Sequence, residues 1–163
     1  MAAGDLRKRL VARGWSSRFR VESAGTHGFR AGQPAHPLAV AEAARRGIDL
    51  SSHVSREITE QDLRQSALVL AMDEQNLNHL AYLSGIGGGA GAPPVTGRLE
   101  LFTAYWRPPW YRRLLGGGRL GGIPDPLGQD PRAFSRCLDR IELGAEALLE
   151  ALSTGCWTGS TDN

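Results

Sequence analysis

Six consecutive apolar residues, Ala67 to Met72, constrain the fold of this 163-residue chain more than any other segment. A continuous apolar run of this length is typical of a β-strand that is buried on both faces. Such strands occur in parallel sheets, where helices cover both sides. The run is far too short to cross a bilayer. It therefore predicts an α/β fold built around a parallel strand.

Helices and strands are expected to alternate around this run. Apolar spacing and glycine stops predict one helix over residues 2–13 and another from Pro37 to Gly47, which carries Leu38, Ala41 and Ala44. A Thr59–Asp62 capping box predicts a short helix near Leu63, and apolar spacing predicts a further helix around Leu77 to Ala81. Alternating patterns predict strands over residues 19–24 and 98–102. Glycine-rich stretches at 85–91 and 116–122 are expected to be flexible.

The last helix has the clearest pattern in the chain. Asp130 is a good N-cap residue and Pro131 suits the first helical position. Apolar residues then recur at three- and four-residue steps, namely Phe134, Leu138, Ile141, Ala145, Leu148 and Leu152. We therefore expect one domain over residues 1–152 and a flexible tail over 153–163.

Composition excludes several classes of function. The formal net charge of +2 is too small to indicate a nucleic-acid binder. The N-terminus has no apolar core of a signal peptide, so neither a secreted nor a membrane protein is expected. The two cysteines, Cys137 and Cys156, fit a reducing compartment better than a disulfide framework. We expect a cytoplasmic monomer.

Four motifs follow one another in a specific order, and together they resemble the low-molecular-weight protein tyrosine phosphatases. They are Phe19 to Thr26, Arg46 to Arg56, Leu70 to Leu77 and Ile123 to Pro126. The resemblance implies a three-layer α/β/α fold with a parallel four-stranded sheet. It also implies hydrolysis of phosphotyrosine in proteins, or of small aryl phosphates, through a phosphocysteine intermediate without metal or cofactor.

The family's nucleophile loop, Cys-x-x-x-x-x-Arg-Ser-Pro, is not found in this sequence. Six positions after Cys137 comes Leu143, and six after Cys156 comes Asp162. Cys137 lies near the apolar face of the last helix, so we expect a buried structural thiol. Catalytic Cys and Arg residues are therefore missing from the chain as written.

Met1 coincides with the residue that commonly follows Arg-Ser-Pro in the family. We therefore expect that the chain is truncated at its N-terminus and lacks the first, interior strand together with the loop. Such a strand contributes perhaps four buried side chains, or about 6–12 kcal/mol, against a total domain stability of ~5–15 kcal/mol. The chain as written is expected to be poorly folded and inactive.

Asp125 is the expected general acid. Asp125-Pro126 matches the family's Asp-Pro, whose aspartate protonates the leaving oxygen and then activates water. The proline holds the preceding backbone extended. By itself this dipeptide indicates only a turn, but its place before a Pro-capped amphipathic helix favours the catalytic interpretation. The family often has aromatic residues next, which line the substrate entrance, whereas this chain has Leu127-Gly128.

Four further residues match supporting positions of the family. The resemblance implies that Ser23 and His53 hydrogen-bond an asparagine of the phosphate loop. It also implies that Asp73 positions the loop and its arginine, and that Phe29 forms an aromatic wall beside the substrate ring. Each has an ordinary alternative. Ser23 could be a turn residue, His53 a solvated histidine, Asp73 a helix N-cap and Phe29 a loop residue.

Two other classes remain open. The chain could be a non-catalytic phosphatase-like binding protein that kept the fold without the loop. A relative of the thioredoxin-coupled arsenate reductases is a weaker alternative, because no cysteine precedes Cys137.

The aromatic segment from Trp106 to Tyr111 could be a contact patch or a packed loop.

Overall fold

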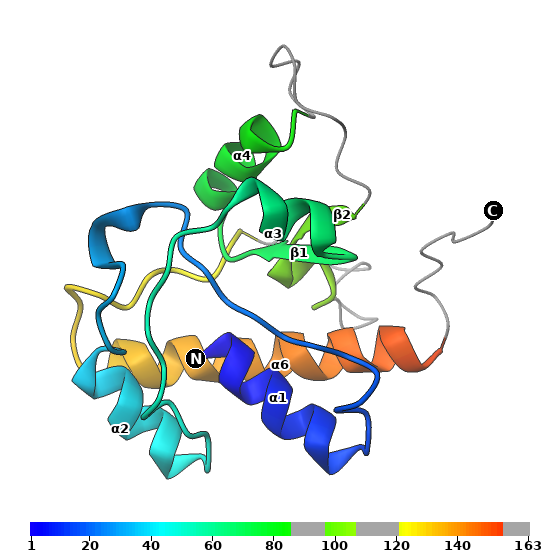
Figure 1. The fold of residues 1–163 in the computed structure, drawn as a ribbon. Helices are drawn as coiled ribbons and strands as arrows, with labels where there is room; N and C mark the ends of the chain where they lie inside the picture. Colours follow the sequence, from blue (N-terminus) through cyan, green and yellow to red (C-terminus); the bar gives the residue numbers. More distant parts are fainter. Residues whose placement is uncertain (86–96, 107–120, 155–163) are drawn as a thin grey trace. The chain divides into compact units, whose positions relative to one another are not determined.

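The computed structural model describes residues 1–85, 97–106 and 121–154 (Figure 1). Two compact units are distinguished: Met1–Glu57 with Asp125–Ala145, and Ile58–Pro124 with Glu146–Asn163. We call them the first and the second unit and describe each by itself. The elements in chain order are α1 (Ala2–Ala12), η1 (Gly28–Arg30), α2 (Pro37–Arg45), α3 (Glu60–Gln65), β1 (Leu68–Ala71), α4 (Glu74–Leu83), β2 (Arg98–Leu101), η2 (Phe102–Ala104) and α6 (Arg132–Ser153).

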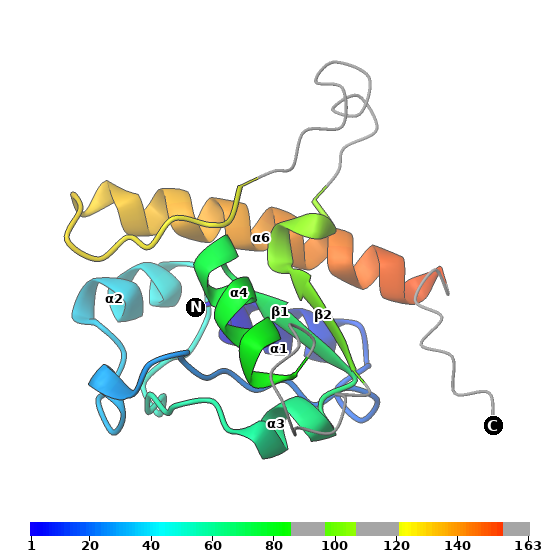
Figure 2. The same cartoon turned by 90° about the horizontal axis from the view of Figure 1, so that it is seen from above.

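The second unit contains the parallel strands that the apolar run predicts. Strand β1 pairs in parallel with β2, with Leu68 opposite Arg98 and Ala71 opposite Leu101. Helix α4 packs against both strands, as Figure 2 shows. The strands predicted within residues 67–72 and 98–102 are therefore confirmed. Burial of β1 on both faces is confirmed only in part, because Ala71 is buried while the other three residues are half-buried.

Capping side chains fix where the helices of the second unit begin. Thr59 and Asp62 form the predicted capping box at the start of α3. Asp73 begins α4 by accepting a hydrogen bond from the backbone N–H of Asn76, with 2.7 Å between the oxygen and the nitrogen. Between these helices, Leu63 and Leu80 are buried in one apolar cluster with Ala71. The two helices expected from the sequence here are confirmed.

In the first unit, helix α1 packs closely against the segment that follows α2. A Cβ atom placed on Gly4 would lie 2.7 Å from Ile48 Cγ2 and 2.9 Å from Leu50 Cδ2, so a larger residue would force these side chains to shift. The predicted ends of both helices are also confirmed, since Gly14 and Gly47 follow them with φ of 68° and 66°.

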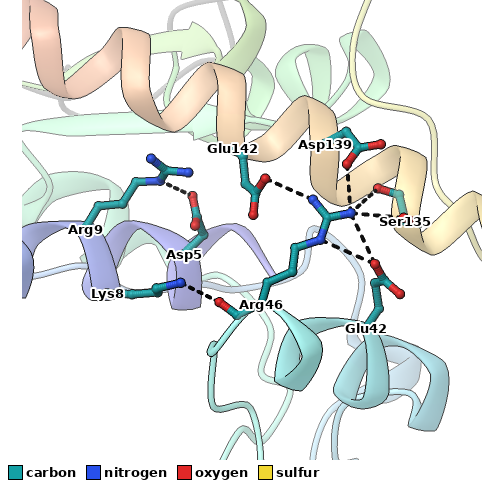
Figure 3. Close-up of polar contacts among 8 residues, drawn as sticks. All are labelled: Asp5, Lys8, Arg9, Glu42, Arg46, Ser135, Asp139 and Glu142. Atoms are coloured by element: carbon teal, nitrogen blue, oxygen red, sulfur yellow. Dashed lines mark hydrogen bonds and ion pairs between the residues drawn. The ribbon is translucent and has the colours of Figure 1, made fainter.

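A guanidinium group joins α2 to the first half of α6 (Figure 3). Arg46, directly after α2, is only 19% exposed in its side chain. It contacts three carboxylates and a serine, namely Glu42 at 3.1 Å, Asp139 at 2.8 Å, Glu142 at 2.9 Å and the Ser135 hydroxyl at 3.0 Å. We call this set the Arg46 cluster.

Helix α6 confirms the clearest pattern in the sequence. The Asp130 carboxylate accepts a hydrogen bond from the backbone N–H of Ala133 at 3.1 Å, as an N-cap does. The predicted apolar face is buried at Phe134, Leu138, Ile141, Ala145 and Leu148, and Leu152 is half-buried. Cys137 is buried, as expected.

Two expectations are wrong in the first unit. Residues 19–24 form no strand, because within the described residues only the neighbouring Gly25 makes a bridge, to Glu57. Alternating residues need a hydrogen-bonded partner to become a strand, and here the Val21 carbonyl accepts instead from the Arg7 side chain. In α2, the positions Leu38, Ala41 and Ala44 are exposed, and Ala39 and Ala43 are buried instead.

Several expectations lie partly or wholly outside the described residues. These are most of the two glycine-rich stretches, the aromatic segment after Trp106, Cys156 and the tail from 155. The single domain over 1–152 stays a prediction. Among the described residues the sheet has two strands, so the four-stranded arrangement also stays a prediction. No helix in the described ranges is long and apolar enough to span a membrane.

We expect Arg46→Gln to lower the free energy of unfolding by about 2–3 kcal/mol, because three carboxylates would lose their charged donor. Arg45→Gln is the matched control. It removes the same charge one residue earlier, but Arg45 is 74% exposed and, among the described residues, pairs only with Glu42. Its effect should stay within ~0.5 kcal/mol. Urea denaturation followed by circular dichroism measures both, and equal effects would contradict a special role for the Arg46 cluster.

Candidate functional site

A polar cavity in the first unit brings two predicted site residues together. It has a volume of about 310 Å³ and is lined by Arg7, Glu22, Ser23, His53, Val54 and Arg56. Ser23 lies in the extended segment after α1, and His53 lies in the segment after α2. The sequence predicted that these two side chains would act at one place, and the structure puts them in the same cavity wall. Arg7 was not predicted as a site residue.

The charges around this cavity are unevenly paired. Glu22 pairs with Arg56 at 2.9 Å and with Arg20 at 3.1 Å. Arg7 has no carboxylate partner among the described residues, and its Nε and Nη2 both donate to the Val21 carbonyl, at 2.9 and 2.6 Å. Burial lowers the pKa of His53, and the positive charges of the amino terminus and Arg7 lower it further. Burial and these charges all favour the neutral form of the His53 imidazole.

Phe29 does not line this cavity. It lies in the short helix η1, is 89% exposed and stacks on His27 with 5.7 Å between the ring centroids. A Cβ atom on Gly28 would lie 2.6 Å from a carboxylate oxygen of Glu57, so a larger residue there would require the Glu57 side chain to move. Phe29 thus stands out from the surface as an exposed aromatic ring on a short helix.

Asp125 lies in an exposed turn that is held by its own neighbours. Its Oδ1 accepts a hydrogen bond from the backbone N–H of Leu127 at 3.0 Å. The side chain of Gln129 donates to the Asp125 carbonyl at 2.6 Å. Oδ2 has no hydrogen-bond partner among the described residues, so it is open to water or to a substrate. A carboxyl group in this arrangement can donate a proton from Oδ2 while Oδ1 is held.

Ile123, two residues before Asp125, belongs to the second unit and contacts the end of β1 there. The backbone N–H of Ile123 donates to the Met72 carbonyl at 2.7 Å, at the end of β1. A Cβ atom on Gly122 would lie 2.3 Å from the Cα of Asp73 and 2.5 Å from the Met72 carbonyl oxygen. This glycine therefore permits a close backbone contact, while residues 116–120 of the stretch expected to be flexible lie outside the described residues.

The remaining candidates differ in what they can do. Asp73 belongs to the second unit, where it caps α4, and its proposed role toward a phosphate loop stays a prediction. Burial raises the pKa of the Cys137 thiol, which keeps it protonated and makes it a poor nucleophile. Within the described ranges, no three histidine, cysteine, aspartate or glutamate side chains gather as metal ligands.

We expect Gly122→Ala to destabilise the protein by about 1–3 kcal/mol, because the new methyl group would overlap backbone atoms that cannot move aside easily. Gly121→Ala is the control. A Cβ atom there meets nothing within 4 Å, so the same substitution one residue earlier should have little effect. Denaturant unfolding compares the two variants. Equal stabilities would show that the close contact at Gly122 is not required.

A second prediction concerns pH. The pKa of His53 is lower in the folded state than the 6.5 of the unfolded state, so the unfolded state binds more protons between these two pKa values. The contribution of His53 to the free energy of unfolding is therefore fully present above pH 6.5 and is lost as the pH falls below it. Unfolding free energies measured between about pH 5 and 7 should therefore depend less on pH in His53→Gln than in the parent. A variant with an unchanged pH dependence would contradict the lowered pKa.

Comparisons with known proteins agree on one family. The family model for "Low molecular weight phosphotyrosine protein phosphatase" matches residues 1–107. The low molecular weight protein-tyrosine-phosphatase Etp of Escherichia coli (strain K12) is 30% identical over 148 residues, covering 91% of this chain and 82% of Etp. YfkJ of Bacillus subtilis (strain 168) is 29% identical over 152 residues, covering 93% of this chain and 86% of YfkJ.

Solved structures give the same fold. A protein tyrosine phosphatase from Entamoeba histolytica superposes with a TM-score of 0.77 at 21% identity, covering 95% of this chain and 89% of that one. YfkJ from Bacillus subtilis superposes with a TM-score of 0.75 at 22% identity, covering 94% and 86%. Both likenesses support an α/β fold with a parallel sheet. By the family model and by the sequence relatives, this chain belongs to the low-molecular-weight phosphotyrosine protein phosphatase family.

Proposed function

We propose that this chain supplies the general acid and the supporting side chains of a protein tyrosine phosphatase site, with Asp125 as the acid. The observation that carries the proposal is the build of the Asp125 turn. One carboxylate oxygen is held by a backbone N–H, and the other has no partner in the described part of the chain. The carboxyl group is thereby oriented without being neutralised by a cation.

Chemically, Asp125 would act twice. Its protonated carboxyl gives a proton to the phenolate oxygen as the bond from phosphorus to that oxygen breaks. The resulting carboxylate then takes a proton from the water that attacks the phosphoenzyme. General acid and base assistance of this kind contributes roughly 10²–10⁴-fold to the rate.

The supporting residues follow the family pattern in our proposal. Ser23 and His53 hold the phosphate loop in its anion-binding shape, and the neutral state of His53 suits an imidazole that both donates and accepts. Phe29 is the aromatic wall for a substrate ring, which its exposure of 89% permits. Asp73 would position the loop arginine while it caps α4.

The nucleophile is the missing part of this site. No Cys-x-x-x-x-x-Arg motif occurs in the 163 residues, and the Cys137 thiol is buried with a raised pKa. We therefore propose that phosphoryl transfer needs a Cys-bearing phosphate loop that these residues do not include, and that residues 1–163 alone do not hydrolyse aryl phosphates. Without attack on phosphorus, an acid has no leaving group to protonate.

The test compares aryl phosphates whose leaving groups differ in basicity. The enzyme is a form extended at its N-terminus by a strand and a loop of the Cys-x-x-x-x-x-Arg pattern. In that form, Asp125→Asn should slow phosphotyrosine hydrolysis by about 10²–10⁴-fold and hydrolysis of an activated nitrophenyl ester much less. Only a basic leaving group needs the proton.

Asp130→Asn is the matched control for this experiment. Asparagine caps helices as well as aspartate does, so α6 should keep its N-terminus and the leaving-group dependence should not change. If Asp125→Asn also leaves that dependence unchanged, the acid is another residue. Asp125-dependent turnover by residues 1–163 without an extension would refute the need for the loop.

A further inference from the structure

A basic surface lies at the C-terminal end of α1 and on the turn that follows this helix. Six arginine and lysine residues, and no acidic residue, lie between Asp5 and Glu22. Three of the six lie on α1 and contact other groups of the first unit, namely Arg7, Lys8 and Arg9. The other three are exposed, namely Arg13, Arg18 and Arg20. Together with Val11, Trp15 and Phe19 they form what we call the α1-turn surface.

Two aromatic rings and a valine give this surface an apolar part. Trp15 and Phe19 are half-buried, with 6.1 Å between their ring centroids. The Arg18 guanidinium lies over both rings, 5.3 Å from the Trp15 centroid and 5.6 Å from the Phe19 centroid, which is the range of a cation–π interaction. Arg18 donates no side-chain hydrogen bond among the described residues, so its N–H groups are available to an outside acceptor. Val11 is 66% exposed at the end of α1.

Local backbone hydrogen bonds determine the shape of this turn. The Trp15 N–H donates to the Leu10 carbonyl at 2.8 Å, and the N–H groups of Arg18 and Phe19 donate to the Trp15 carbonyl at 2.9 and 3.2 Å. Gly14 has a φ of 68°, which lets the chain change direction after α1. None of the six residues of the α1-turn surface lines the first-unit cavity. The surface is therefore separate from the residues that we assign to a phosphate loop.

The positive charge of this surface is only partly compensated. Arg20 pairs with Glu22, but Glu22 also pairs with Arg56, so one carboxylate serves two guanidinium groups. The Arg20 side chain remains 81% exposed. The formal net charge of +2 averages over the whole chain and therefore does not reveal this local excess.

We infer that the α1-turn surface docks the protein on an anionic lipid bilayer, with its arginines at the headgroups and Trp15 at the same level. Basic residues beside tryptophan, phenylalanine and valine are typical of a contact with the membrane interface. A nucleic acid also presents phosphates, but it offers the exposed Val11 no apolar environment. The inference goes beyond the proposed function, because docking requires neither Asp125 nor a nucleophile, and a peripheral contact requires no spanning helix.

The experiment is co-sedimentation of residues 1–163 with two kinds of vesicle. One kind contains phosphatidylcholine alone, and the other contains about one-third phosphatidylserine. The protein should bind the anionic vesicles much more tightly, and binding should weaken as the salt concentration rises. Replacing Arg13, Arg18 and Arg20 by glutamine should weaken binding by about 100-fold, at roughly fivefold for each charge.

The matched control replaces Arg132, Arg136 and Arg140 of α6 by glutamine. These three exposed residues belong to the same unit, so the net charge falls equally, yet vesicle binding should change by less than about threefold. Circular dichroism confirms that both triple variants are folded. Equal losses in the two triple variants, or equal binding to both kinds of vesicle, would overturn the inference.

A second pair of variants leaves every arginine in place. Val11→Asp puts a negative charge on the α1-turn surface and should weaken binding to the anionic vesicles by about fivefold or more. Leu143→Asp is its control, since Leu143 is 51% exposed on α6, and it should have little effect. Unchanged binding in Val11→Asp contradicts the docking. So does arginine-dependent binding to soluble polyglutamate or to an oligonucleotide without binding to vesicles, since the partner is then a protein or a nucleic acid.

Discussion

The Arg46 guanidinium and its three carboxylates hold the first unit together. A cation that is 19% exposed has lost most of its hydration, and only close carboxylates and a hydroxyl can replace it. Glu42 lies on α2 and Glu142 lies on α6, 96 positions after Arg46. The cluster therefore fixes the start of α6 within the first unit. The Asp125 turn leads directly into that helix, so the position of the acid depends on this contact.

The Asp125 turn itself is short and is restrained by its own neighbours in the first unit. Asp125 Oδ1 accepts a hydrogen bond from the backbone N–H of Leu127, and the Gln129 side chain donates to the Asp125 carbonyl. On its C-terminal side, Asp130 caps α6. A turn restrained in this way keeps the carboxyl group exposed to solvent and holds it in one orientation. General acids need that combination, because proton transfer depends on geometry before it depends on pKa.

Local signals explain why much of the fold could be predicted. Pro37 in the first turn of α2 and the capping residues Thr59 and Asp130 of α3 and α6 indicate where these helices begin. The apolar run before Met72 predicts β1. The errors come from non-local partners. Residues 19–24 alternate like a strand, but a strand exists only where another pairs with it. Arg46 and Gly122 owe their roles to atoms that are distant in sequence, so spacing alone could not identify them. Ser23 and His53 were found through the family motifs and share one cavity.

The proposed phosphatase site needs three kinds of groups, and the 163 residues offer candidates for two of them. The turn offers an acid, and the cavity of Arg7, Ser23 and His53 offers donors around a positive charge. A cysteine nucleophile must be a thiolate at neutral pH, and burial works against this at Cys137 by raising the pKa of its thiol. In our proposal the Ser23 hydroxyl and the His53 imidazole hold the phosphate loop, so they would support a nucleophile that the loop supplies.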